Sequence, residues 1–167
     1  MRNMKKKVVG SFGSLLMATG ILAATAPTAQ AENTVYTSNL CSTTTSWTCF
    51  SLYYTSGGSS PVGACFSTRT SISNHTSEIR SYGDPPYNTT ARYYYIFGLQ
   101  SACSAFGPGD GYSQSIRNNA AGAINRDSAA HTVFYSPGYM GNSVRYAPGA
   151  SKLLGDLRND NASSKRG

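Results

Sequence analysis

The sequence predicts an all-β fold that is built from two repeated units. It contains 12 tyrosines and 17 glycines, and this composition favours short strands joined by tight turns. No long segment shows the 3.6-residue apolar period of an amphipathic helix. The string at residues 116–123 is echoed without gaps at residues 157–164. A repeat at a fixed offset is typical of a duplicated supersecondary unit.

Residues 1–31 have the pattern of a secretory signal peptide. Positions 2–7 carry four Lys and Arg residues, residues 8–24 are mostly apolar, and a small-x-small cleavage site ends at Ala31. The apolar run is too short, and too rich in Gly, Ser and Thr, to predict a membrane span. We therefore expect residues 32–167 to form a mature chain that is secreted to the extracellular space.

The mature chain carries only a small net charge. Four of the 14 Lys and Arg residues belong to the predicted signal peptide, so ten remain against seven Asp and Glu residues, a net charge of +3. The ten basic residues are mostly scattered, whereas a nucleic-acid interface needs a basic patch. We expect a soluble, single-domain monomer that binds neither nucleic acid nor a membrane.

All four cysteines lie in the predicted mature chain, and an even number in an exported protein indicates disulfide bonds. Four cysteines allow three pairings, of which we favour Cys41 with Cys49 and Cys65 with Cys103. The first bond closes a short, mostly polar loop. The second closes a longer loop, and chain-entropy models predict that such a bond stabilises the fold by about 3–4 kcal/mol. Zinc binding is disfavoured, because the sequence has no C-x-x-C pair and no paired histidines.

The first unit, residues 48–125, begins with an aromatic strand at residues 48–54, and a turn rich in Gly, Ser and Pro follows at residues 55–61. This unit is longer than the second by about 40 residues, and such an excess marks an insertion rather than a new core. We place the insertion at residues 63–105. Its tyrosine-rich segment, residues 91–97, is predicted to be a strand.

The second unit, residues 132–167, begins in the same way. An aromatic strand at residues 132–135 leads into a Pro-Gly turn. Two short segments of the chain, residues 119–124 and 151–157, have the composition of single helical turns. The two units therefore share a strand and a turn at their start and differ mainly in length.

The closing string, residues 159–164, reads Asn-Asp-Asn-Ala-Ser-Ser and fits the pattern Asn/Asp-Asn/Asp-x-x-Ser/Thr-Ser at every specified position. Residues 135–141 form an aromatic-turn-glycine corner, and Cys-x-x-x-Tyr-Tyr occupies residues 49–54. In these features the chain resembles the βγ-crystallins, and in particular a family of exported bacterial metallopeptidase inhibitors with a crystallin-like fold. The resemblance implies a βγ-crystallin-like sandwich of two Greek keys, which correspond to the two units, with the insertion in the first.

The resemblance also implies a calcium site in the closing string. The expected ligands are Asn159, Asp160, Ser163 and Ser164, with a degenerate partner motif at Asn118 and Asn119 of the earlier string. Calcium takes six to eight oxygen ligands, but the earlier string has Gly and Ala where the hydroxyl residues are expected. We therefore expect weak calcium binding or none, and no required cofactor. Alternatively, these Asn and Ser side chains bond their own backbone and shape a corner.

Inhibition of a secreted metallopeptidase is the activity that the resemblance implies. A rigid, disulfide-tied loop can occupy a protease cleft, because its order lowers the entropy cost of binding. The candidate loops are residues 67–76 and 82–90, but the sequence marks no reactive bond, so the inhibitory residues are unknown. The alternatives are a calcium-binding module, a carbohydrate-binding module that uses Tyr93, Tyr94 and Tyr95, and a small antimicrobial toxin.

We expect no enzymatic activity from this sequence. It has no H-E-x-x-H, G-x-S-x-G or phosphate-loop motif. Asp127, Ser128 and His131 are close in sequence, but a catalytic triad is defined by geometry. We interpret these three residues as part of a solvated linker between the two units.

Overall fold

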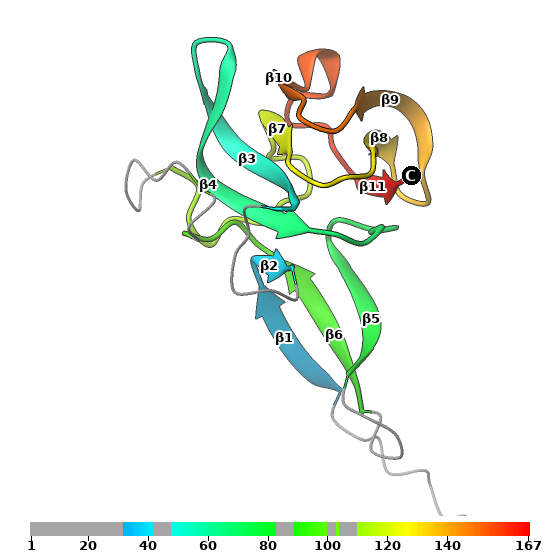
Figure 1. Cartoon of the computed structure of the whole chain (residues 1–167). Coiled ribbons are helices and arrows are strands. Elements are labelled where there is room, and N and C mark those ends of the chain that lie inside the picture. Colours follow the sequence, from blue (N-terminus) through cyan, green and yellow to red (C-terminus); the bar gives the residue numbers. More distant parts are fainter. Residues whose placement is uncertain (1–31, 42–47, 83–88, 100–102, 104–109) are drawn as a thin grey trace, which may run out of the picture. The chain divides into compact units, whose positions relative to one another are not determined.

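The structure, a computed structural model, describes residues 32–41, 48–82, 89–99, 103 and 110–167 (Figure 1). The predicted signal peptide lies outside these residues, as does most of the candidate loop 82–90. The described chain is all-β, as predicted. Its elements are β1 (Asn33–Thr37), β2 (Asn39–Leu40), β3 (Phe50–Gly57), β4 (Ser60–Thr68), β5 (Ser77–Tyr82), β6 (Thr89–Tyr95), β7 (Gly122–Asn125), β8 (His131–Ser136), β9 (Met140–Tyr146), β10 (Ser151–Leu153), the 3-10 turn η2 (Gly155–Leu157) and β11 (Ser163–Arg166).

The described strands form three sheets. One sheet has the strand order β10-β7-β3-β4-β2, the second has the order β11-β8-β9, and the third has the order β1-β6-β5 (Figure 1). The β1–β6 and β2–β4 pairs are parallel. The other neighbouring strands run antiparallel, including the β3–β4 hairpin, in which Gly58 has a φ of 62° at the turn. Glycine adopts this left-handed conformation without a steric penalty.

Each unit contributes a segment to the sheet of the other unit. Strand β10 belongs to the second unit but pairs with β7 of the first, with Lys152 opposite Ala123. Conversely, Ile72 of the first unit forms an antiparallel bridge with Ser164 in β11 of the second. Because of this exchange, backbone hydrogen bonds join the two units, and each unit helps to complete the sheet of the other.

Buried side chains from the first two sheets meet in one hydrophobic core. Phe50 and Leu52 of β3 are fully buried in it, together with Val133 of β8 and Tyr146 of β9. The rings of Phe50 and Tyr146 make an edge contact, with centroids 5.6 Å apart. Full burial of a Leu or Phe side chain stabilises a fold by about 1.5–3 kcal/mol, so this core holds the two sheets together.

The β1-β6-β5 sheet accounts for much of the extra length of the first unit. Strands β5 and β6 lie in the expected insertion, whereas β1 precedes the first unit. Residues 63–68, where we placed the start of the insertion, are instead part of β4, and Ala64 and Phe66 belong to the core. Tyr95 of β6 packs on Phe66, with ring centroids 5.4 Å apart. This contact connects the third sheet to the core.

One predicted helical turn is wrong and the other is half right. Residues 122–124 of the segment 119–124 belong to β7, because β3 and β10 pair with them on both sides. Such pairing overrides a weak local preference. The segment 151–157 is strand β10 followed by the 3-10 turn η2, so only its second part is helical.

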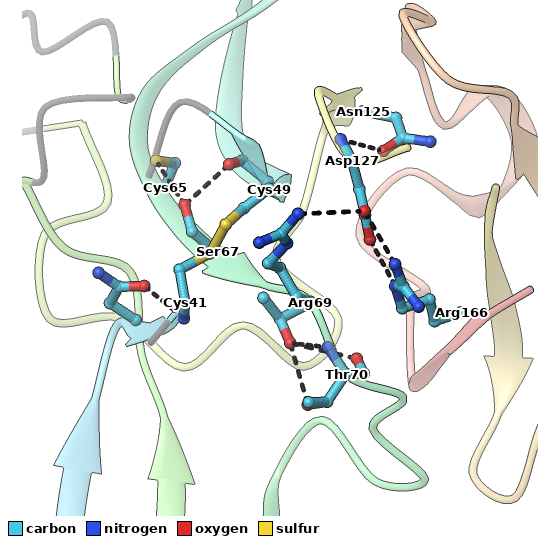
Figure 2. Close-up of a disulfide and its surroundings, with 12 residues drawn as sticks. Cys41, Cys49, Cys65, Ser67, Arg69, Thr70, Asn125, Asp127 and Arg166 are labelled. Carbon is cyan, nitrogen blue, oxygen red and sulfur yellow. Dashed lines mark hydrogen bonds and ion pairs between the residues drawn. A yellow bond between two sulfur atoms is a disulfide. The ribbon is translucent and has the colours of Figure 1, made fainter. Parts of the chain in front are cut away.

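The two disulfide bonds have the pairing that we favoured from the sequence. Cys41 is bonded to Cys49, which joins the end of β2 to the start of β3 (Figure 2). Cys65 of β4 is bonded to Cys103. Two disulfide bonds indicate that the protein resides in an oxidising environment. In the part of the chain that the structure describes, no helix is long and apolar enough to cross a membrane.

Candidate functional site

The two echoed strings lie side by side and exchange backbone hydrogen bonds. The amide of Asn118 donates to the carbonyl of Asn161, and the amide of Asn159 donates to the carbonyl of Ala120, both at 2.9 Å. Positions 118 and 120 correspond to 159 and 161 in the repeat, so the two bonds are equivalent with the roles reversed. Asn118 and Asn159 both have a left-handed backbone, with φ of 56° and 61°, which Asn tolerates better than most residues.

The side chain of Asn161 breaks the equivalence of the two strings. Its Oδ1 accepts a hydrogen bond from the amide of Ala120 at 2.9 Å, and its Nδ2 donates to the carbonyl of Ile116 at 2.7 Å. The corresponding position in the first string is Ala120, which has no polar side chain. Asn161 is fully buried. It therefore fixes the first string in place, and the first string has no residue that does the same in return.

His75 joins this network from the segment before β5. Its Nδ1 accepts a hydrogen bond from Nδ2 of Asn161 at 2.9 Å, so the proton of the neutral ring is on Nε2, which donates to Oγ of Ser164 at 3.0 Å. Burial lowers the pKa of His75 to about 3, against a weaker opposing effect of the Asn161 backbone. His75 is therefore neutral at neutral pH and serves as a buried hydrogen-bonding link.

The two serine hydroxyls of the predicted calcium motif are engaged inside the protein. Oγ of Ser163 donates to the carbonyl of Ser136 at 2.6 Å and accepts the amide of Tyr139 at 3.1 Å. Oγ of Ser164 is bonded to His75. Both serines are fully buried. These contacts pin the β8–β9 turn and the segment before β5 against β11, which favours the corner-forming interpretation of the motif.

The other predicted calcium ligands lie at the surface. Asn159, Asp160 and Asn118 are exposed, and the half-buried Asn119 donates from Nδ2 to the carbonyl of Ser115 at 3.0 Å. The described residues contain no group of three or more His, Cys, Asp or Glu side chains that could hold a metal. Because the serine oxygens face inward and the Asn and Asp side chains face outward, the residues do not fit a shared calcium shell. Weak calcium binding, or none, stays a prediction.

Asp127 and His131 are buried, so the prediction of a solvated linker is wrong for them. Asp127 is only 2% exposed and His131 is 0% exposed. Arg166 donates to the Asp127 carboxylate from Nε at 2.6 Å and from Nη2 at 3.0 Å (Figure 2). Nε2 of His131 lies 2.9 Å from the same carboxylate. These bonds, that of Arg166 above all, hold the pKa of Asp127 well below its usual range.

The geometry around Asp127 is that of a structural clamp. The hydroxyl of Ser128 points to the Asp127 carboxylate at 3.4 Å rather than to His131, so this serine is not placed as a nucleophile. The imidazole of His131 stacks on Phe50, with centroids 4.5 Å apart and an angle of 5° between the planes. Burial lowers the pKa of His131. Arg166 thus anchors the end of β11 to the connection between the two units.

Residues 69–76, which make up most of the candidate loop 67–76, form a rigid segment that we call the braced segment. Its backbone is bonded to β11 and the residue before it: Ile72 exchanges two hydrogen bonds with Ser164, and the amide of His75 donates to the carbonyl of Ala162 at 2.8 Å. The side chains of Ile72 and His75 are buried, whereas Thr70 and Thr76 are exposed. The segment bends at residues 69–70, 73 and 75–76, and it is anchored on one side and open on the other.

Glu78 braces this segment from β5. Its Oε1 accepts hydrogen bonds from the amide and the hydroxyl of Ser73 and from the amide of Asn74. Its Oε2 accepts from Nη2 of Arg80 at 2.7 Å and from the hydroxyl of Tyr95 at 2.9 Å. Burial opposes ionisation of Glu78, but the bonds from Ser73, Tyr95 and Arg80 outweigh it and lower the pKa of this carboxyl. A fully bonded carboxylate thus fixes the middle of the braced segment.

No protein-family model, curated protein or solved structure matches the chain. The candidate site consists of the braced segment, Glu78 and the Asn161–His75–Ser164 network behind it. Sequence reasoning named Ser164 and the loop but missed the roles of Asn161 and His75. The one available signal was that Asn161 stands where the first string has Ala120. The contacts of His75 cannot be read from the sequence, because its partners lie 86 and 89 positions away.

Proposed function

We propose that the chain is a secreted binding protein with a βγ-crystallin-like fold of two Greek keys. The strand orders β10-β7-β3-β4 and β9-β8-β11 support this fold. Each unit contributes one segment to the sheet of the other, β10 in one direction and Ile72 in the other. The reciprocal bonds between Asn118 and Asn161 and between Asn159 and Ala120 support a duplication. The two disulfide bonds support secretion, since such bonds persist in oxidising compartments.

Its proposed activity is inhibition of a secreted metallopeptidase, with binding rather than catalysis as its mechanism. The braced segment is the observation that carries this proposal. A segment that is already ordered loses little entropy when it enters a peptidase cleft. Ile72 and His75 anchor the segment inward, while Thr70 and Thr76 face solvent. Glu78 prevents the middle from collapsing or fraying by holding Ser73 and Asn74.

An inhibition titration tests this function. The mature protein is added in molar excess to a thermolysin-like metallopeptidase and, separately, to a subtilisin-like serine peptidase, and hydrolysis of a peptide substrate is followed. We expect the metallopeptidase to lose activity in proportion to the amount of protein added. Full activity of both enzymes at excess protein would overturn the proposal.

A matched pair of variants tests the role of the brace. Glu78→Ala removes the acceptor for Ser73 and Asn74 and loosens the segment, so the inhibition constant should rise by about ten-fold. Asp156→Ala removes a carboxylate from the exposed turn η2 and should leave inhibition unchanged. Equal inhibition by the two variants would exclude the braced segment as the contact surface, even if the wild-type protein inhibits.

A further inference from the structure

The third sheet has an exposed aromatic face that the proposed inhibitory segment does not use. Tyr36 of β1 lies opposite Tyr94 of β6 in the parallel register. Their rings stack, with centroids 5.3 Å apart and an angle of 24° between the planes. Tyr36 is nevertheless 67% exposed. Tyr36 therefore rests on Tyr94 and leaves much of its own surface open to solvent.

A pocket of about 520 Å³ begins at Tyr36 and continues this surface. Its apolar wall includes Ile96, Leu99 and Tyr112, and its polar wall includes Ser38 and Asn39. Tyr112 is 50% exposed and Leu99 is 45% exposed. Single exposed apolar residues are common on protein surfaces. Several exposed apolar residues around one pocket, in contrast, are typical of a binding site.

The walls of the pocket are held in place by the residues of both disulfide bonds. Gly98, which lines the pocket, exchanges two backbone hydrogen bonds with Cys65, at 3.0 and 2.9 Å. Oδ1 of Asn39 accepts the amide of Cys41 at 2.7 Å. This bond fixes the Asn39 side chain, and its Nδ2 makes no hydrogen bond to the described part of the chain, so it is left to donate to a ligand. The pocket is thus formed in advance of binding.

The chemistry of the lining selects for an uncharged ligand. None of the described residues that line the pocket carries a charge, and an ion would lose its hydration there without gaining a charged partner. Tyrosine rings offer a flat apolar face with a polar edge. Asn39 supplies an amide donor. A ligand that matches this lining has flat C–H faces and a rim of hydroxyl groups.

We propose that this pocket and the Tyr36–Tyr94 face bind a neutral saccharide chain. One sugar ring stacks on Tyr36, the next enters the pocket beside Tyr112, and Asn39 donates a hydrogen bond to a hydroxyl group. This function goes beyond peptidase inhibition and does not depend on it, because no residue of the braced segment lines the pocket. Binding to a polysaccharide surface would retain the secreted protein near that surface.

Retention on insoluble polysaccharides tests the proposal. The mature protein is mixed with cellulose, chitin, xylan and starch granules, and the bound fraction is measured with and without soluble oligosaccharides of the same sugar. We expect retention on at least one of these neutral polysaccharides, with release by its own oligosaccharide. Tyr36→Ala and Tyr112→Ala should each weaken retention by about ten-fold, because each removes a stacking ring. Tyr36→Phe keeps the ring and should keep most of the binding.

Tyr135→Ala provides a matched control. It removes a tyrosine of β8 that is 54% exposed and does not line the pocket, and should leave retention unchanged. Because Tyr36 and Tyr112 are exposed, all variants should fold, and Tyr36→Ala should lower the unfolding temperature only by the small contribution of its stacking on Tyr94. No retention on any of the four polysaccharides would overturn the proposal, as would equal retention by wild type and Tyr36→Ala. A proline-rich peptide serves as a second competitor. If this peptide releases the protein and the oligosaccharides do not, the pocket binds peptides and the saccharide proposal is overturned.

Discussion

The candidate site depends on a single side chain, that of Asn161. It satisfies the amide of Ala120, the carbonyl of Ile116 and Nδ1 of His75, and it is fully buried. A buried polar group that loses its partner carries the full cost of desolvation. Asn161 therefore links the two strings and the braced segment, because His75 belongs to that segment.

Replacing Asn161 with Ala should destabilise the protein by about 2–4 kcal/mol, because it leaves the amide of Ala120 and Nδ1 of His75 without a partner and removes one of the two hydrogen bonds to the carbonyl of Ile116. Urea unfolding of the mature protein at neutral pH measures this change. Asn142→Ala, an exposed position in β9, is the control and should change the free energy of unfolding very little. Equal stability of the two variants would contradict the role assigned to Asn161.

Acid should weaken the fold through His75. The pKa of His75 is about 3 in the folded state against 6.5 when the side chain is free. Between these values the unfolded chain binds a proton that the folded chain does not, so stability falls as the pH is lowered from 6.5 towards 3. One such histidine contributes a slope of about 1.4 kcal/mol per pH unit.

The variant His75→Gln isolates this effect, because it cannot take up the proton. The free energy of unfolding should then depend less steeply on pH between 6.5 and 4, while His131 and Asp127 still contribute. Burial lowers the pKa of His131, so its contribution has the same sign. The lowered pKa of Asp127 adds stability that is present above the ordinary carboxyl pKa and is lost as the pH falls below it. An unchanged slope in His75→Gln would show that His75 titrates normally.

At the scale of the elements, strands with a strong aromatic pattern were predictable and elements set by distant pairing were not. The predicted strands at residues 48–54, 132–135 and 91–97 overlap β3, β8 and β6. The strand β7 was missed because its sequence, Gly-Ala-Ile-Asn, has little preference of its own and is ordered by β3 and β10. The insertion was placed too early because the strand β4 has no recognisable echo in the second unit.

The two disulfide bonds should differ in their contribution to stability. Cys41–Cys49 closes a separation of 8 residues and Cys65–Cys103 closes one of 38. Chain-entropy arguments give about 2–3 kcal/mol for the first and about 4 kcal/mol for the second. We expect the double variant Cys65→Ala/Cys103→Ala to lose more stability in urea than Cys41→Ala/Cys49→Ala. The reverse order would mean that native packing, rather than loop closure, determines their effect.

At the scale of the whole molecule, the repeat predicted a duplication, but the exchange of segments between the two units could not be derived from it. Pairing of Lys152 with Ala123, and of Ile72 with Ser164, depends on the folding of distant parts of the chain. The sequence of the closing string predicts that its Asn and Ser side chains shape a corner. It could not reveal that the hydroxyls of Ser163 and Ser164 face inward, since direction relative to a neighbouring strand is a tertiary property.

Calcium should change the stability of the protein little or not at all. A ligand that binds the folded state raises the melting temperature, and the rise increases with the affinity and concentration of the ligand. Two of the predicted calcium ligands, Ser163 and Ser164, are bonded within the protein. Thermal unfolding with calcium, with magnesium and with a chelator measures the effect. A rise in melting temperature that only calcium produces would show that the closing string forms a metal site.

Hydrogen–deuterium exchange of the mature protein, alone and mixed with a thermolysin-like metallopeptidase, tests the proposed inhibition most directly. The exposed side of the braced segment should enter the peptidase cleft. We therefore predict that exchange slows at residues 69–76 in the mixture and stays unchanged in the β1-β6-β5 sheet at Tyr36 and Tyr94. Unchanged exchange at residues 69–76, or slower exchange only elsewhere, would contradict the proposal that this segment inhibits a peptidase.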